Sequence, residues 1–277
     1  AAAVREGIAI EYGKRLVTLA EHADQVTAGF ADGTSVTADL LVGADGINSP
    51  TRTLLDPSAP APRFLGLLNA GGFTTGPVAA DLDRTPGLVH MAYGKRCFFG
   101  WSLAPDGSVW WFANPPSKRP HTGFTPARWR AHLLDLVAGD AIPAAAIIRA
   151  TGEVLGPWNT FDLPRVRIWR TGRAVLIGDA AHAVAPSSGQ GASMAIEDAV
   201  TLGRCLAGSA APAALTAYEG LRRARVEKVV AFGRRNSSGK TAGPVGGWIR
   251  DRVTPPLMRM LYRNGDPQAW IFDHRLS

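Results

Sequence analysis

The hydrophobic and polar positions near the start of the chain alternate in the way that extended strands do. Residues 25–30 and 34–40 form two such stretches, separated by Asp32-Gly33. An Asp-Gly pair between two extended stretches is a strong hairpin signal, because the turn needs residues that tolerate positive φ. The second stretch continues into the apolar run at 40–46, which predicts another strand that ends at an Asp-Gly pair.

A second group of strands is expected in the middle of the chain. Proline and glycine become frequent after Pro57, and short strands are then indicated at 87–93, 96–103 and 108–114, with Asp106-Gly107 as a turn. These strands predict an antiparallel sheet. Its aromatic side chains are expected to form a core or a pocket wall, and they are Phe98, Phe99, Trp101, Trp110 and Trp111.

A helix is expected at 125–137, after the predicted sheet. Thr125 has the character of an N-cap, and Pro126 suits the first helical position, where no backbone N–H is needed. A short apolar run at 173–177 then predicts a buried strand.

Two longer helices are predicted after that strand. The helix at 192–206 carries apolar residues at 195, 199, 202 and 206, on one face of a 3.6-residue period. The helix at about 212–232 is expected to turn Leu215, Tyr218, Val226 and Val229 inward. The remainder, through Gly243-Pro244 and Pro255-Pro256 to Ser277, is expected to mix loop with short helix.

The order of these elements indicates a mixed fold, with α/β and α+β character. Residues 1–55 and 166–211 are predicted to form two parts of one α/β domain, and 56–165 are predicted to form a β-sheet domain inserted between them. Residues 212–277 are expected to form a C-terminal helical segment.

Composition narrows the class of protein. With 277 residues, of which 46% are hydrophobic and 19% charged, the chain is expected to be globular. No apolar run approaches the roughly 18 residues of a membrane span, and the net charge of +7 comes from scattered basic residues without a nucleic-acid recognition motif. Neither a membrane nor a nucleic acid is therefore an expected partner.

The cysteines and the chain start carry two further expectations. Cys97 and Cys205 offer neither a disulfide framework nor metal-ligand spacing, so a cytoplasmic location and no bound metal are expected. The apolar part of the first residues is too short for a secretion signal. The chain does not begin with methionine, which indicates a processed, truncated or partly represented chain.

The most informative stretch runs from Gly178 to Ser193. Asp179 follows the predicted strand at 173–177, at the end of a strand where ligands of open α/β sheets collect, and its carboxylate can accept hydrogen bonds from a polyol. Gly189 and Gly191 allow backbone N–H groups to approach a flat ligand, and the helix that follows presents the positive end of its dipole. This pattern is typical of a cofactor site.

A second strand ends in Asp45-Gly46 and is followed by Ser49 and Arg52. Together with the Gly178–Ser193 stretch and the intervening β-rich insertion, it resembles the class A flavoprotein monooxygenases of the para-hydroxybenzoate hydroxylase type. The single-component members related to salicylate hydroxylase, zeaxanthin epoxidase and urate hydroxylase are the most similar. The resemblance extends through residues 190–199 and 222–236.

The resemblance implies an FAD site in a partial Rossmann-like FAD-binding domain, with residues 1–55 and 166–211 as its second and third parts and 56–165 as the substrate domain. Asp179 would hold a ribityl hydroxyl, and Pro186 would lie near the flavin ring. The backbone around Gly189, Gln190, Gly191, Ala192 and Ser193 would face the pyrimidine side of the flavin.

The resemblance also gives roles to residues in the first part of the chain. Asp45, Gly46 and Arg52 would support both FAD and the approach of the nicotinamide nucleotide, and the backbone of Leu16 would meet the adenine. Structural alternatives stay open, because Asp179 could merely cap the next turn, and Asp45 and Arg52 could form only a turn and an ion pair. His182 could be catalytic, but a histidine in such a turn more often satisfies nearby backbone groups.

Two departures from the family pattern stand out. The sequence contains no Gly-x-Gly-x-x-Gly turn, so no cradle for the FAD pyrophosphate is indicated. Ser193 stands where asparagine is common.

Glu197 and Asp198 are neighbours on one helix and point about 100° apart, so they are not expected to form an acid/base pair.

The resemblance implies an FAD-dependent monooxygenase. NADPH or NADH would reduce the flavin, dioxygen would add at C4a, and the resulting hydroperoxide would oxygenate an aromatic or polyketide-like small molecule near residues 88–114. No catalytic acid or base is indicated, and the substrate, the choice of nucleotide and the oligomeric state are not predicted. Two alternatives remain: an FAD-dependent reductase of the same superfamily, or a truncated, non-catalytic fragment unable to bind FAD alone.

Overall fold

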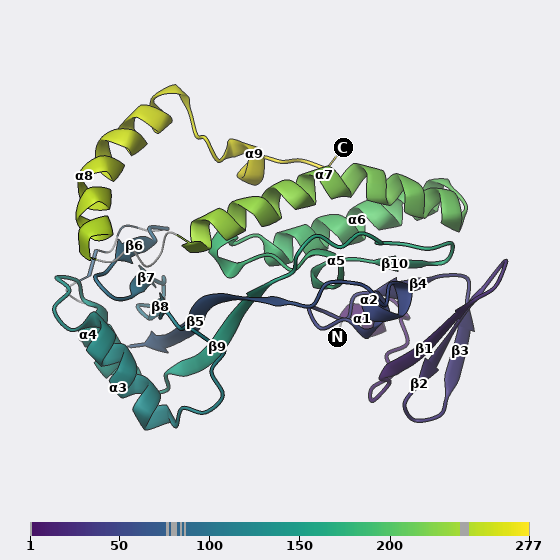
Figure 1. The fold of residues 1–277 in the computed structure, drawn as a ribbon, viewed down its shortest axis with the longest axis horizontal. Helices are drawn as coiled ribbons and strands as arrows, with labels where there is room; N and C mark the ends of the chain where they lie inside the picture. Colours follow the sequence, from purple (N-terminus) through teal and green to yellow (C-terminus); the bar gives the residue numbers. More distant parts are fainter. Residues whose placement is uncertain are drawn as a thin grey trace. The chain divides into compact units, whose positions relative to one another are not determined.

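The computed structural model describes residues 2–75, 78, 82–83, 85, 87–238 and 244–276. Contacts within the chain divide it into two units (Figure 1). The first unit contains residues 1–63 and 162–231, and the second contains residues 64–161 and 232–275. The first unit is therefore assembled from two stretches that are distant in the sequence. The segment boundaries indicated by the sequence stay a prediction.

The first unit begins with an antiparallel meander. Its strands are β1 (Leu16–Glu21), β2 (Val26–Phe30) and β3 (Ser35–Ala38), in that order. The hairpin predicted around Asp32-Gly33 is confirmed, because Val26 pairs with Ala38 and Gly33 adopts a φ of 84°. The sequence pattern did not indicate β1.

A short parallel pair brings the two halves of the first unit together. β4 (Leu41–Gly43) pairs with β10 (Ala174–Leu176), with Leu41 opposite Ala174 and Gly43 opposite Leu176. All three residues of β10 are buried, which confirms the strand predicted there. The helix α2 (Pro50–Leu55) follows β4, and the one-turn helix α5 (Asp179–His182) follows β10. The ends of both strands thus lie at one edge of the pair.

Two long helices complete the first unit: α6 (Gly191–Gly208) and α7 (Ala211–Ser238), which extends into the second unit. The inward positions predicted on α7, from Leu215 to Val229, are confirmed as fully buried. The predicted inward face of α6 is wrong in part, because Ala199 is exposed. The buried residues of α6 are Met194, Asp198, Thr201 and Leu202.

The physical reason for the different face of α6 is the side chain of Asp198. Its exposed fraction is 0%, and its carboxylate accepts hydrogen bonds from three groups on α7 and around α5. A fully hydrogen-bonded carboxylate can occupy an inward position that a hydrophobicity pattern assigns to an apolar residue.

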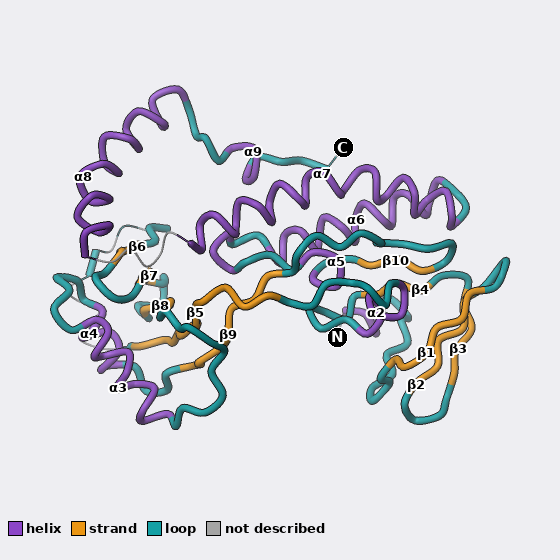
Figure 2. The backbone as a smooth tube through the Cα atoms, viewed as in Figure 1, coloured by secondary structure: helices purple, strands orange, loops and turns teal. Residues whose placement is uncertain are grey.

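The second unit contains a five-stranded sheet with the order β6-β7-β8-β5-β9 (Figure 2). The predicted strands are present as β6 (His90–Tyr93), β7 (Phe98–Leu103) and β8 (Val109–Asn114), and they pair antiparallel. The sequence pattern did not indicate β5 (Arg63–Thr74) or β9 (Leu155–Asp162). The glycines of β5 hide its strand character in the sequence. The sheet requires a glycine at position 72, because an added Cβ would lie 2.8 Å from the Thr151 side chain.

One face of this sheet forms the core of the second unit. The helices α3 (Pro126–Val137) and α4 (Ala144–Ala150) contribute Trp129, Leu133 and Ile147 to a cluster with strand residues that include Trp111. The predicted cap of α3 is confirmed, because the Thr125 side chain accepts the N–H of Arg128. Trp101 and Trp111 are core residues, whereas Trp110 is exposed.

The C-terminal region differs from its prediction. An 18-residue helix, α8 (Pro244–Leu261), carries Pro255 and Pro256 in its interior, and the short helices η3 (Tyr262–Asn264) and α9 (Ala269–Phe272) follow. Each proline leaves a carbonyl of the preceding turn without its N–H donor. Residues 252–263 are exposed, so water can reach the carbonyl of Arg252, which Pro256 leaves without a donor. The remaining short elements are α1 (Ala2–Arg5) and η2 (Pro186–Ser188).

Replacing Gly100 by alanine is expected to destabilise the protein by about 1–3 kcal/mol, because overpacking forces neighbouring groups to move. The phenyl ring of Phe112 lies over Gly100 on the adjacent strand, and an added Cβ would overlap it. Urea denaturation followed by circular dichroism measures the change. The matched control is Gly203→Ala in α6, where an added Cβ meets open space and the helix should gain about 0.5–1 kcal/mol. Equal effects of the two substitutions would contradict this explanation.

Candidate functional site

The two Asp-containing motifs of the first unit lie close together. The parallel pairing of β4 and β10 places Asp45 and Asp179 just beyond the ends of adjacent strands, and the Ile177 N–H donates to the Gly43 carbonyl at 3.0 Å. Arg52 links the two loops. Its guanidinium donates to the Ala180 carbonyl at 2.9 Å and to the Ile47 carbonyl at 2.7 Å. The hydrogen bond from Arg52 to Ala180 spans 128 positions of sequence and thus joins the Asp45 and Asp179 motifs within one unit.

Asp45 is held by the start of α2. Its carboxylate accepts the Ser49 hydroxyl at 2.5 Å, the Thr51 N–H at 2.9 Å and the Thr51 hydroxyl at 2.6 Å. Three of the roughly four acceptor positions of the carboxylate are therefore occupied within the loop. The backbone N–H of Gly46 is not part of this set, and Gly46 adopts a φ of 79°. The carboxylate thus organises the turn, whatever else it binds.

Arg52 is buried, with an exposed fraction of 3%. Burial lowers the pKa of its guanidinium, and the nearby Asp45 carboxylate opposes that shift. Its hydrogen bonds go to backbone carbonyls, and no ion pair within 4.0 Å joins it to Asp45 among the described residues. Arg52 therefore acts as a brace between the two loops rather than as a partner in a simple ion pair.

Replacing Ser49 by alanine is expected to cost about 1 kcal/mol of stability, because Ser49 is the N-cap of α2. Its hydroxyl accepts the Arg52 N–H at 2.8 Å, and the residue is buried, with an exposed fraction of 1%. Thermal and urea unfolding measure the loss. Thr53→Ala is the control, since Thr53 is exposed on the same helix and makes only a 3.4 Å bond to the Ser49 carbonyl. A loss of similar size in both variants would argue against the capping role.

Asp179 is an exposed carboxylate at the first position of α5. Within the described part of the chain it makes no hydrogen bond or ion pair. Gly178, just before it, has φ 57° and ψ −140°, a conformation that residues with a side chain rarely adopt. The alternative that Asp179 caps the next turn is not supported by a side-chain hydrogen bond in α5. Its oxygens are therefore available to a ligand.

The segment after α5 ends in an uncapped helix N-terminus. Pro186 begins η2 and is exposed, and Gly189 adopts a left-handed conformation with φ 64°. Gln190 is the buried N-cap residue of α6, and its side chain makes no capping hydrogen bond. The N–H groups of the first helical residues have no partner within the helix. They belong to Gly191, Ala192 and Ser193, of which the last two are exposed.

A buried charge network lies behind α5 and α6. The Asp198 carboxylate meets the His182 Nε2 at 2.5 Å and accepts the Arg222 Nε–H at 2.7 Å. Arg222 and Arg225 both donate to Glu197. Burial opposes ionisation of Asp198, but the hydrogen bonds from His182, Gly178 and Arg222 outweigh it and hold the Asp198 pKa below its usual value.

Sequence reasoning missed this network, in which Arg222 joins the carboxylates of Glu197 and Asp198. The signal lay in the helical period. Asp198 stands four residues from both Met194 and Leu202, and Arg222 stands four residues from both Tyr218 and Val226, so each charge occupies an inward row. A charge on the inward row of two adjacent helices indicates a buried pair. The imidazole of His182 meets the Asp198 carboxylate rather than a local backbone group.

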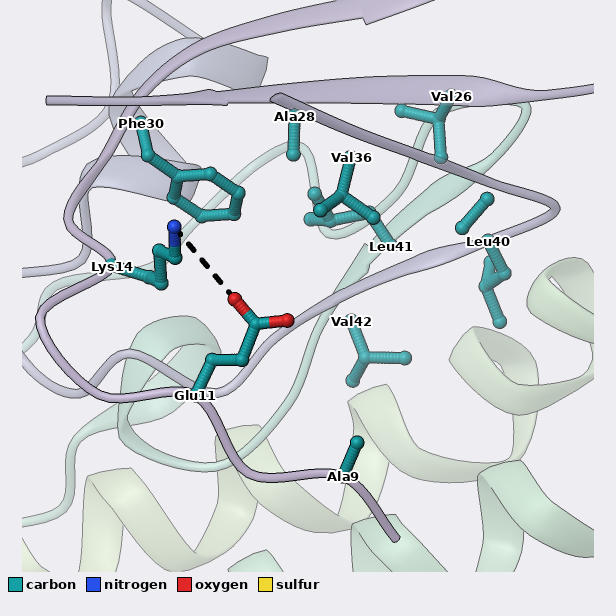
Figure 3. A pocket seen from close by; sticks show the side chains of 11 residues that line it. Ala9, Glu11, Lys14, Val26, Ala28, Phe30, Val36, Leu40, Leu41 and Val42 are labelled. Carbon is teal, nitrogen blue, oxygen red and sulfur yellow. Dashed lines mark ion pairs between the residues drawn. The ribbon is translucent and has the colours of Figure 1, made fainter. Parts of the chain in front are cut away.

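Leu16, the first residue of β1, is half-buried near a pocket of the meander. The pocket has a volume of about 380 Å³, and Figure 3 shows its apolar wall with Lys14 and Glu11 facing one another. Lys14 lies 2.8 Å from Asp32 and 3.7 Å from Glu11. Because its single lysine already faces two carboxylates, this pocket suits an apolar or neutral group better than a diphosphate.

These features define a class of protein. An exposed carboxylate after a parallel strand and an uncapped helix N-terminus in the same unit are typical of α/β proteins that bind a nucleotide cofactor. No helix within the described residues combines the length and apolar character needed to cross a membrane. Residues 1–233 match the model of the FAD binding domain family. The chain belongs to this family, and the proteins that it resembles include monooxygenases and hydroxylases.

Individual relatives agree with this assignment. Aurachin C monooxygenase/isomerase of Stigmatella aurantiaca is 33% identical over 249 residues, which cover 86% of this chain and 60% of that protein. FAD-dependent urate hydroxylase of Klebsiella pneumoniae is 35% identical over 240 residues, 82% of this chain and 58% of that protein. The chain thus spans about three fifths of the length of these relatives.

The fold is also found in a solved structure. HpxO of Klebsiella pneumoniae, complexed with FAD and uric acid, superposes with a TM-score of 0.78 and 26% identity, covering 96% of this chain and 66% of that one. The mixed α/β architecture expected from the sequence is thereby confirmed.

Proposed function

We propose that this protein is an FAD-dependent monooxygenase that uses NADPH or NADH and dioxygen to oxygenate a small aromatic molecule. The observation that carries the proposal is the free carboxylate of Asp179 in the same unit as the uncapped N-terminus of α6. The names of the relatives support oxygenation over a purely reductive activity, since they are monooxygenases or hydroxylases.

The residues fit the two ends of a flavin. Asp179 would accept a hydrogen bond from a ribityl hydroxyl, and Pro186 would lie beside the ring. The backbone from Gly189 to Ser193 would face the pyrimidine edge, where the left-handed Gly189 and the free N–H groups allow close approach. Asp45, Gly46 and Arg52 would brace the opposite loop, and the Leu16 backbone would meet the adenine.

The chemistry at this site divides between cofactor and protein. Bound FAD supplies electron transfer from the nicotinamide nucleotide and the activation of dioxygen. With FAD bound in this way, the α6 N-terminus would stabilise negative charge at the pyrimidine edge by roughly 0.3–2 kcal/mol, depending on burial. The brace of Arg52 between the two loops keeps the site preorganised, so this stabilisation costs little rearrangement.

The proposal is tested by titrating the protein with FAD and following flavin fluorescence. NADPH or NADH oxidation is then measured with a panel of phenolic and heteroaromatic compounds under ¹⁸O₂. We expect flavin binding, oxidation stimulated by at least one aromatic compound, and one labelled oxygen atom in the product. Absence of flavin binding would refute the proposal, and oxidation without incorporation of label would replace it with a reductase.

A further inference from the structure

The carboxylate of Asp198 holds both ends of the turn that carries Asp179. Its Oδ2 accepts the Gly178 N–H at 2.9 Å and lies 2.5 Å from the His182 Nε2. Gly178 is the N-cap of α5, and His182 is its last residue. The buried side chain of Asp198 on α6 therefore contacts the short helix both before and after the exposed Asp179.

A close contact between Gly178 and Ala195 also holds the turn against α6. A Cβ added at Gly178 would lie 3.1 Å from the Cβ of Ala195, so the turn packs directly on α6. Asp198 lies seven residues beyond Gly191, the first residue of α6, which corresponds to roughly 10 Å along the helix axis. The position of Asp179 relative to the free N–H groups of α6 is thus set through a rigid helix.

Two carboxylates and two guanidinium groups balance the charge of the network without a contribution from His182. Glu197 and Asp198 face the guanidinium groups of Arg222 and Arg225. The second ring nitrogen of His182, Nδ1, is buried and has no hydrogen-bond partner among the described residues. The His182 ring is thus enclosed, with one nitrogen anchored to Asp198 and the other facing no acceptor or donor among the described residues. The geometry therefore favours a positioning role for His182 over acid/base chemistry.

We propose, on the basis of the function proposed above, that His182 and Asp198 are positioning residues that hold Asp179 at the ribityl chain of the flavin. Neither side chain touches the cofactor in this arrangement. Asp198 anchors the turn to α6, and His182 closes the turn by adding a second hydrogen bond to the same carboxylate oxygen. Loss of the pair affects recognition of the ribityl chain more than recognition of the ring.

The test compares riboflavin with lumiflavin, which has the same ring system but lacks the ribityl chain. In His182→Leu the hydrogen bond to Asp198 is lost, whereas the amide nitrogen of His182→Gln can replace the Nε2 donor. Equilibrium dialysis should show about a tenfold loss of riboflavin affinity in His182→Leu, recovery to within about threefold of wild type in His182→Gln, and less than a twofold change for lumiflavin.

Glu197→Gln is the matched control, because it alters the same network without touching α5. It should leave the preference for riboflavin over lumiflavin unchanged. Equal loss of both flavins in His182→Leu would indicate general structural damage and overturn the proposal, as would unchanged binding of both. If wild-type protein binds neither flavin nor FAD, the proposed function fails and the positioning role falls with it.

Discussion

Replacing Arg222 by methionine is expected to lower the free energy of unfolding by about 3–5 kcal/mol, the usual cost of breaking a buried ion pair by removing one partner. Arg222 is 2% exposed and donates to Asp198 at 2.7 Å and to Glu197 at 2.5 Å. Methionine replaces much of the aliphatic stem but leaves Asp198 without its cation. Urea denaturation followed by circular dichroism measures the loss.

Arg225→Met is the control for this experiment. Arg225 pairs with Glu197 and is nearer the surface, with a side chain 11% exposed, so a cost of about 1 kcal/mol or less is expected. Equal losses in the two variants would show that Asp198 does not need its own cation.

The pH dependence of this effect has a defined sign. In the wild-type protein the Asp198 pKa is lowered, so its contribution to stability is present above the unfolded-state pKa and is lost as the pH falls through the folded-state value. In Arg222→Met one of the hydrogen bonds that lower the Asp198 pKa is lost, so this pKa should rise relative to the wild-type protein. The stability deficit of the variant should therefore stay constant near neutral pH and shrink as the pH is lowered from about 5 toward about 3. A deficit that stays constant over this range would contradict the explanation.

Replacing Asp179 by alanine is expected to raise the FAD dissociation constant roughly 10- to 150-fold, which corresponds to losing a charge-assisted hydrogen bond of about 1.5–3 kcal/mol. Because Asp179 is exposed and makes no described side-chain hydrogen bond, the urea midpoint should stay unchanged. Asp179→Asn keeps an acceptor oxygen without the charge and should fall between the alanine variant and the wild-type protein.

The control for Asp179 is Asp24→Ala, an exposed carboxylate in the turn between β1 and β2. This variant should bind FAD as the wild-type protein does. Fluorescence titration with FAD measures all of the affinities. A loss at Asp24 equal to the loss at Asp179 would assign the effect to overall charge rather than to a specific hydrogen bond.

Elements that depend on neighbouring residues could be predicted from the sequence. The hairpin at Asp32-Gly33 and the cap at Thr125 are determined within a few positions, and both are present. The inward row of α7 follows from the regular apolar period that includes Leu215 and Val229, although the buried Arg222 lies on the same row. Local chemistry sufficed in each case.

Elements that depend on distant residues could not be predicted in this way. β5 was missed because its glycines resemble loop glycines until the side chains of Trp111 and Thr151 are placed against Gly72. The inward face of α6 was misassigned because Asp198 becomes an acceptable core residue only when Arg222 and His182 reach it. Both errors come from partners that the local sequence does not contain.

The candidate site was predictable as a set of residues through a family resemblance. Its assembly was not, because the pairing of β4 with β10 and the bond from Arg52 to the Ala180 carbonyl join distant segments.

The pairing of β4 with β10 also affects how the chain reaches its folded state. The bond from Gly178 to Asp198 closes 20 residues, whereas the bond from Arg52 to Ala180 closes 128, which costs about 1.6 kcal/mol more in loop-closure entropy. During synthesis β4 leaves the ribosome long before β10 exists. Throughout that interval the unpaired N–H and C=O groups of this apolar strand are open to other chains, so rapid or crowded expression should favour aggregation at this strand.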